Sequence, residues 1–139
     1  MKPLPVVLAF ALAVTAFAAD EEEKHPIDRK IAAAEEKAVS TAEMRQVYVD
    51  GLKAWDAELN RVYGELKKKL KPNTFAVLQS AQRQWIVYRD EQMKFISSMY
   101  AEFDGTMYIP MRASAEMEIT RARALELWRQ LQVVSDHAQ

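Results

Sequence analysis

The chain has 139 residues, of which 28% are charged and 50% are hydrophobic, and its formal net charge is −1. This length fits one domain, and a charge so near zero argues against nucleic acid or an anionic membrane as the partner. Three glycines among abundant Ala, Glu, Lys, Leu and Met favour an all-α fold over a sheet. Because the chain contains no cysteine, its stability must come from helix packing without disulfides.

The first 18 residues differ in character from the rest of the chain. Lys2 precedes an apolar run over residues 4–17, and small residues stand at Ala16 and Ala18. This pattern is typical of a signal peptide that is cleaved after Ala18 or one residue later. The alternative is a permanent membrane anchor, although the run is short of the ~20 residues that span a bilayer. We therefore expect a periplasmic or secreted protein with no stable membrane span after processing.

Two further parts follow the leader. Residues 19–26 should form a disordered acidic tail, and residues 27–135 a single helical domain. Ile27, Ile31 and Ala34 recur at helical spacing, which predicts a short first helix of about ten residues.

Two long helices are expected at the centre of the domain. Ser40 and Glu43 fit a capping box, which predicts a helix over about 40–70. Pro72 should end that helix and start another over about 73–101, antiparallel to the first. The result would be a helical hairpin whose first member carries a continuous apolar stripe: Met44, Tyr48, Leu52, Trp55, Leu59, Val62, Leu66 and Leu70.

The hairpin predicts which polar residues face each other. With the turn centred near residues 71–73, facing residues have numbers that add to about 144. Asp56 should then lie near Arg89, and Asn60 near Gln82, as a part-buried polar network. The alternative is that Arg89 lies along a tryptophan with its guanidinium in water. The aromatic residues expected to seal this network are Trp55, Tyr63 and Trp85.

The connection over residues 104–111 is unusually apolar for a surface loop, and Pro110 punctuates it. It leads into a last helix over about 113–135. Exposed apolar loops are often contact surfaces, so we expect a partner site here. The alternative is that the loop folds back and caps the bundle. The candidate partner-binding residues are Asp104, Gly105, Thr106, Met107 and Tyr108.

No catalytic, cofactor or metal motif is evident. His25 and His137 stand at opposite ends of the mature chain, so a metal pair is not expected. Helical carboxylates such as Asp90 and Glu91 are explained by ion pairing and solvation. A carboxylate pair that acts on a glycan needs a cleft, and a small bundle offers little of one. We therefore expect a protein that is not an enzyme and uses no cofactor.

The spaced aromatic and polar motifs resemble the LprI-like lysozyme-inhibitor domain family, exported bacterial helical proteins of which many have no known function. The resemblance rests on the segments 55–63, 82–90 and 120–124. It implies a protein partner, a lysozyme-like muramidase. Many relatives carry cysteines at places where this chain has residues that form no disulfide: Val47, Met93, and Ser114 or Met117.

Two functions from different classes follow from these observations. The first is a non-enzymatic exported binding protein that inhibits lysozyme, as the resemblance implies. The second is an envelope structural or assembly factor that binds a partner protein through the apolar loop over residues 104–111.

Overall fold

The computed structural model describes residues 25–137. Within this range the chain forms four helices: α1 (Pro26–Glu35), α2 (Thr41–Lys69), α3 (Pro72–Tyr100) and α4 (Tyr108–Asp136). The predicted all-α bundle is therefore confirmed. The predicted leader and almost all of the predicted acidic tail lie outside the described residues. Among the helices of residues 25–137, none combines the length and apolar character needed to cross a bilayer.

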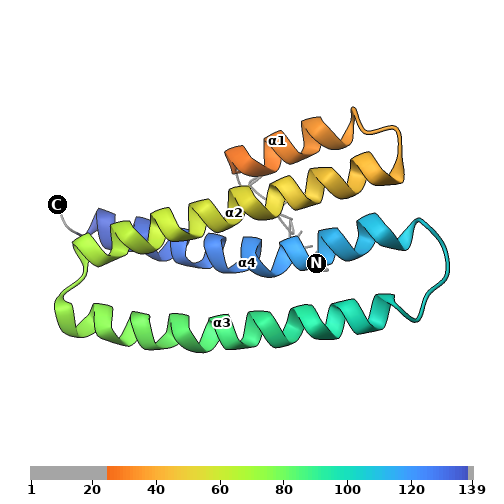
Figure 1. Cartoon of the computed structure of the whole chain (residues 1–139). Helices are drawn as coiled ribbons and strands as arrows, with labels where there is room; N and C mark the ends of the chain where they lie inside the picture. The colour runs from red at the N-terminus through yellow and green to blue at the C-terminus, as the bar shows by residue number, and fades with distance from the viewer. Residues whose placement is uncertain (1–24, 138–139) are drawn as a thin grey trace, which may run out of the picture.

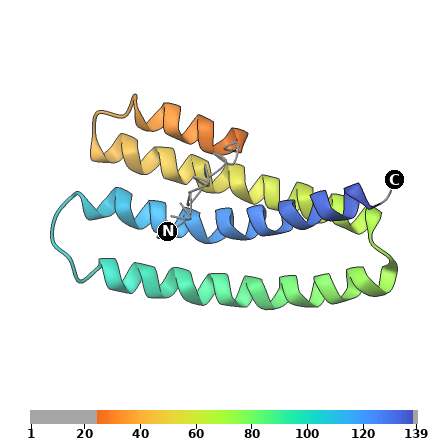
Figure 2. The ribbon, with the colours of Figure 1, turned by 180° about the vertical axis from the view of Figure 1, so that it is seen from behind.

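The helices lie side by side with their axes roughly aligned (Figures 1 and 2). α1 runs antiparallel along the outer side of α2, and α2 packs in parallel against α4. α3 runs antiparallel to both long neighbours and lies along the other side of the pair. The order across the bundle is thus α1, α2, α4 and α3, with the central packing between α2 and α4.

The start of α2 has the predicted capping box. The Glu43 N–H donates to the Ser40 hydroxyl at 3.1 Å, and the Ser40 N–H donates to the Glu43 carboxylate at 3.1 Å. At the other end, Leu70 and Lys71 are extended, with ψ of 148° and 147°, and Pro72 opens α3. The two-residue break therefore forms because proline disfavours helical backbone in the residue before it.

The last helix begins five residues earlier than the sequence predicts, at Tyr108 instead of about 113. Pro110 lies in its first turn, where a helix leaves its amide groups without intrahelical partners, so the missing N–H of proline costs nothing. Only residues 101–107 remain as the connection between α3 and α4. Within it Gly105 has φ of 122°, a conformation that favours glycine.

The hydrophobic core lies between α2 and α4. Small residues on α4 allow the two backbones to approach: Ala124 is fully buried, and Thr120 and Ala113 are nearly so. The larger buried side chains interlock around them, and burying each one contributes roughly 1.5–3 kcal/mol. The buried side chains of this cluster are Trp55, Leu59, Val62, Leu66, Met117, Ala124, Leu127 and Leu131.

α3 packs less deeply than the hairpin prediction implies. Ile96 is its one fully buried residue, while Leu78 and Trp85 are only partly buried against the core. Gln82 and Arg89 also lie on its inward side, and polar side chains oppose close packing. α2 and α3 are thus connected as a hairpin, but α2 takes its main packing partner from α4.

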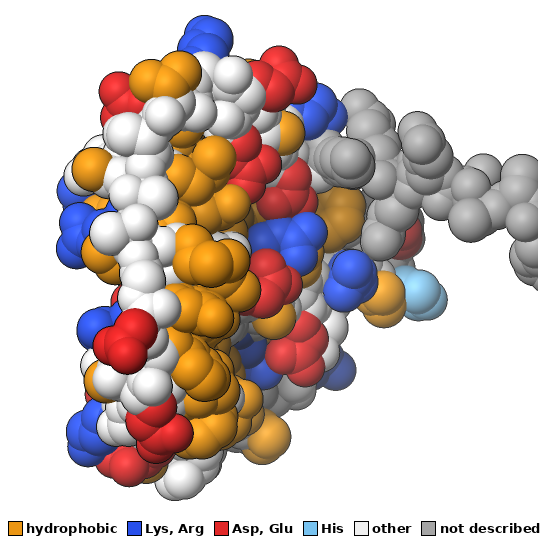
Figure 3. Space-filling model, turned by 90° about the vertical axis from the view of Figure 1, so that its right-hand side faces the viewer, with side chains coloured by type: hydrophobic (Ala, Val, Ile, Leu, Met, Phe, Trp, Pro, Cys, Tyr) orange, Lys and Arg blue, Asp and Glu red, His pale blue; other side chains and the backbone are white. Residues whose placement is uncertain are grey.

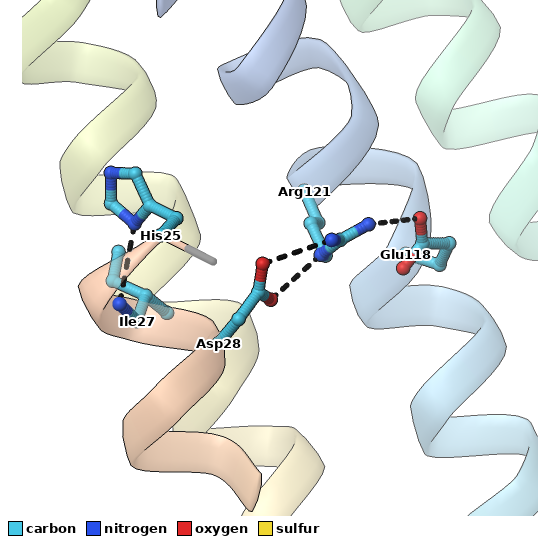
Figure 4. A network of polar contacts seen from close by, with 5 residues as sticks. All are labelled: His25, Ile27, Asp28, Glu118 and Arg121. Atoms are coloured by element: carbon cyan, nitrogen blue, oxygen red, sulfur yellow. Dashed lines mark hydrogen bonds and ion pairs between the residues drawn. The ribbon is translucent and has the colours of Figure 1, made fainter. Parts of the chain in front are cut away.

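α1 has no fully buried residue and depends on contacts at both of its ends. Near its start, the Arg121 guanidinium of α4 donates to both carboxylate oxygens of Asp28, at 2.8 and 2.9 Å (Figure 4). Near its end, the Tyr48 hydroxyl of α2 donates to Glu35 at 2.7 Å. Burial and the neighbouring Glu35 carboxylate raise the pKa of Tyr48, so this hydroxyl stays protonated.

The two glycines of α2 should respond in opposite ways to alanine. A Cβ at Gly64 meets nothing within 4 Å, so Gly64→Ala should raise stability by about 0.5–1 kcal/mol through helix propensity. A Cβ at Gly51 would lie 2.5 Å from the Met117 sulfur and 3.0 Å from Ile31, so Gly51→Ala should lose most or all of that gain. Thermal melts of both variants check this expectation, and an equal gain at the two sites would contradict the close packing at Gly51.

Asp28→Asn should loosen α1. The neutral amide cannot accept both guanidinium bonds as strongly, and for a partly exposed pair the expected loss is about 1 kcal/mol. Hydrogen exchange should therefore quicken in residues 26–35 while the α2–α4 core keeps its protection. Glu126→Gln removes a comparable bond, from Arg123, within α4 and is the matched control. Unchanged exchange in α1 after Asp28→Asn would show that this pair does not hold the helix.

Candidate functional site

The structure does not bring the predicted polar network together. Asp56 and Asn60 are exposed on α2. Arg89 donates instead to its neighbour Asp90, at 2.8 and 2.9 Å, with its guanidinium 5.4 Å from the centre of the Trp85 ring. Among residues 25–137, no ion pair joins Asp56 to Arg89. The position of Arg89 over a tryptophan matches the alternative drawn from the sequence.

The pairing of Gln82 with Asn60 is corrected in the same way. Gln82 accepts a hydrogen bond from Arg123 of α4 at 3.1 Å. The correction for Gln82 has a physical cause: α4 lies beside the inward side of α3 and supplies the partner expected from α2. Arg89 finds its partner on its own helix, in Asp90. The sequence signal for Arg123 was its place on the polar face of the last helix.

The three aromatic residues expected near the network have different surroundings. Trp55 is 1% exposed in the α2–α4 core, and its indole N–H finds no hydrogen-bond partner in the described part of the chain. Trp85 is half-buried on α3. Tyr63 is also half-buried and packs on Phe75, with ring centres 5.2 Å apart. Only Trp55 therefore belongs to the core itself.

The predicted partner-binding residues lie at the end of the bundle where α3 turns into α4. Asp104, Gly105, Thr106 and Met107 are exposed, whereas Tyr108 is half-buried in the first turn of α4. Viewed onto this end, hydrophobic side chains form a continuous band with charged side chains beside it (Figure 3). Four large hydrophobic residues of segment 103–111 are exposed: Phe103 by 46%, Met107 by 59%, Ile109 by 47% and Met111 by 44%. We call these four residues the apolar end.

Phe103 of the apolar end belongs to a cluster of rings with Tyr100 and Tyr108. Phe103 and Tyr108 have ring centres 5.0 Å apart, and Tyr100 lies 6.1 and 6.4 Å from them. Pro110, between the exposed Ile109 and Met111, is buried. The loop thus folds back in part, as the alternative reading expected, yet its largest apolar side chains stay accessible. A hollow of about 490 Å³ adjoins it, lined by Met44, Tyr48, Tyr100, Pro110, Met111, Ser114, Ala115 and Glu118.

A second hollow, of about 860 Å³, opens where α1 begins, and sequence reasoning missed it. His25 accepts a hydrogen bond from the Ile27 N–H at 3.2 Å and so caps α1 (Figure 4). Its ring packs on Trp55 at 4.8 Å and on Trp128 at 6.2 Å. The signal available in the sequence was His25-Pro26, a capping residue followed by proline at a helix start. We call this hollow the arginine cleft.

Charged side chains line the arginine cleft. Arg61 donates to both carboxylate oxygens of Glu58, at 2.8 and 2.7 Å, and this bond lowers the pKa of Glu58. Arg121 bonds Asp28 and Glu118 and lies 5.7 Å from the Trp55 ring centre. The Asp28 hydrogen bond raises the pKa of Arg121, so its charge is permanent. The cleft can therefore attract anions, and its carboxylates are already engaged.

Neither hollow has the features of a metal site. In residues 25–137, no group of three or more His, Asp or Glu side chains is placed to hold a metal ion. The apolar end suits recognition of a partner by apolar contact, and the arginine cleft suits recognition by charge.

Comparison with solved structures supports the fold. A crystal structure of an uncharacterized protein from Burkholderia thailandensis is similar to this chain, with a TM-score of 0.75 and 24% sequence identity. The match covers 81% of this chain but 57% of the solved one, so the chain spans a little over half the length of that relative. No curated protein matches the sequence.

The family is shown by a sequence model described as lysozyme inhibitor LprI, which matches residues 32–127. The matched range takes in all of α2 and α3, the end of α1 and most of α4. It therefore includes the α2–α4 core except Leu131, the apolar end and part of the arginine cleft. The chain is a member of the lysozyme inhibitor LprI family.

Proposed function

We propose that this chain is an exported, non-enzymatic binding protein that inhibits a lysozyme-like muramidase through the apolar end. The observation that carries the proposal is the family match over residues 32–127, whose description names lysozyme inhibition. The signal-peptide pattern of residues 1–18 supports export, where muramidases act. The apolar end supports the choice of surface.

The apolar end has the properties of a binding surface. Its four large exposed side chains come from one short stretch, residues 103–111, and ring contacts with Tyr100 and Tyr108 limit the movement of Phe103. Burying exposed apolar surface on a partner contributes about 25 cal/mol per Å² before the costs of association. Pre-ordering by the rings reduces those costs, because less side-chain freedom is lost on binding.

Charge at the apolar end favours a basic partner. Glu102 and Asp104 are exposed in the same connection, whereas Glu118, which lines the adjoining hollow, is paired with Arg121. Arg112 donates to Glu116 one turn further along α4, which offsets both charges. An acidic rim around an apolar centre would speed and orient the approach of a cationic muramidase.

The second candidate is an envelope assembly factor that uses the same surface. The observation in its favour is the same set of exposed apolar side chains, which would also fit a helix of a membrane-associated protein. The two proposals differ in the partner and share the site, so one pair of variants separates them.

Met107→Asp should weaken inhibition while leaving the fold intact, because this side chain is exposed and its replacement removes apolar contact and introduces a desolvation cost. We expect the inhibition constant to rise at least about tenfold, which corresponds to ~1.4 kcal/mol. The assay is lysis of cell-wall suspensions by chicken-type and goose-type lysozymes. Val87→Asp, at a 60% exposed apolar site on α3, is the matched control and should inhibit like the parent.

Two results would count against this proposal. Absence of inhibition of either lysozyme type by the folded parent at micromolar concentration would remove the muramidase function. Equal inhibition by Met107→Asp and the parent would remove the apolar end as the surface.

If the chain is instead an assembly factor, an envelope extract should yield a membrane protein that co-purifies with the parent and with Val87→Asp. Met107→Asp should lose it, since both proposals place the contact at the apolar end. Recovery of the same protein by Met107→Asp would contradict this second function.

A further inference from the structure

A third hollow, of about 540 Å³, lies at the end of the bundle opposite the apolar end, where α2 and α4 finish and α3 begins (Figure 1). Its apolar walls come from all three helices: Leu66, Leu70, Val77, Leu78 and Val134. The other side chains that line it are polar and uncharged, from Asn73, Thr74 and Gln130. Ligand sites in proteins have volumes of about 300–1,000 Å³ and combine apolar walls with a few polar groups. This hollow therefore has the size and the lining of a site for a small apolar group.

Basic side chains border the hollow. The exposed sequence neighbours of the two α2 leucines in its walls are all lysines: Lys67, Lys69 and Lys71. Lys67 is turned toward the start of α3, since its ammonium nitrogen lies 5.8 Å from the centre of the Phe75 ring. The nearby carboxylate of Glu65 is already paired with Lys68, at 2.7 Å. The last turn of α4 adds one acid to this end, Asp136, so within residues 25–137 the lysines outnumber the carboxylates that could balance them.

Helix stability does not explain the lysine at position 71. Lys71 is the N-cap of α3 and makes no side-chain capping hydrogen bond. Ser, Thr, Asp or Asn is preferred at this position, and the helix dipole disfavours a cation there. Lys67 and Lys69 lie in the last turn of α2, where the dipole favours cations. A residue that departs from a local rule in this way is expected where a function requires it.

We propose that this hollow, which we call the lysine-bordered hollow, binds the alkyl chain of a long-chain fatty acid. The aliphatic walls suit an unbranched chain, and Lys67, Lys69 and Lys71 select a carboxylate over a neutral or cationic head group. A protein interface needs about 800 Å² on each partner, whereas a hollow of this size suits one small ligand. About 40 Å of helix separates Met107 from Val134 along α4, so the inference holds or fails independently of the muramidase proposal.

Titration with dodecanoate, at concentrations at which it stays monomeric, tests the site on the chain from Ala19 onward. Calorimetry should show a single bound dodecanoate, and dodecyltrimethylammonium, with the same alkyl chain and the opposite charge, should bind at least about tenfold more weakly. Octanoate should also bind at least about tenfold more weakly, because each buried methylene strengthens binding severalfold. Amide resonances in NMR spectra should shift around Leu70, Val77 and Val134 and stay unchanged around Met107.

Two pairs of variants locate the alkyl chain and the head group. Val77→Asp and Val87→Asp replace valines of α3 that are 71% and 60% exposed, and of the two only Val77 lines the hollow. Val77→Asp should therefore raise the Kd at least about tenfold, and Val87→Asp should leave it unchanged. The combined change Lys67→Gln, Lys69→Gln and Lys71→Gln should weaken binding of dodecanoate about tenfold and not that of dodecyltrimethylammonium. Its control removes the same charge at exposed lysines elsewhere, by Lys30→Gln, Lys53→Gln and Lys94→Gln.

Several results would overturn this proposal. They are absence of binding at about 1 mM dodecanoate, equal affinity for the two head groups, and equal effects within either pair of variants. Resonance shifts confined to the apolar end would place the ligand there instead. Sedimentation of the chain with phosphatidylglycerol vesicles, without binding of dodecanoate, would show that the lysines contact a membrane surface.

Discussion

The structure depends on the close packing of α2 against α4. Small residues on α4, above all Ala124 and Thr120, let its backbone approach the large buried side chains of α2. Trp55 is the largest of these and is nearly without exposed surface. Without cysteines, this interlocking is the main source of cooperative stability, since no covalent link holds the helices. The positions of α1 and α3 follow from which sides of the pair remain free.

Each outer helix leaves a different surface at its border with the central pair. α1 is attached by polar contacts and by the partly buried side chains of Ile27 and Ile31, and a hollow lined by guanidiniums and tryptophan lies where it begins. α3 is attached largely by half-buried apolar side chains, and the short connection from α3 into α4 leaves Phe103, Met107 and Ile109 exposed. The charged surface and the apolar surface therefore lie in different parts of the bundle, which allows them to serve different contacts.

Local signals in the sequence predict the helices well. Three signals predict the helices correctly without tertiary information, because each depends on residues close together in the sequence. They are the Ser40–Glu43 capping box, the break at Pro72 and the apolar stripe through Trp55. The predicted start of the last helix is too late, because the sequence pattern places Pro110 in a loop. Proline is tolerated in the first turn of a helix as readily as in a loop. The apolar character of the segment around it remained a sound indication of an exposed apolar surface.

Local signals could not predict which helix packs most closely against α2. α3 and α4 both present apolar residues at helical spacing, and connectivity alone favours the neighbour in sequence. The deciding feature is the size of the side chains at the contact, where Ala124 permits closer approach than Gln82 or Arg89. Arg121 and Asp28 lie 93 residues apart, so their pairing required the helix order first. Arg89 found a partner in the adjacent Asp90, which a register argument overlooks.

Native-state hydrogen exchange of the whole bundle tests the central role of the α2–α4 pair most directly. The amides around Trp55 and Leu59 in α2 and around Ala124 and Leu127 in α4 should exchange most slowly and together, by global unfolding. Those of α3 should exchange faster, through openings that leave the pair intact. Slowest exchange shared by α2 and α3, with α4 opening first, would contradict this account.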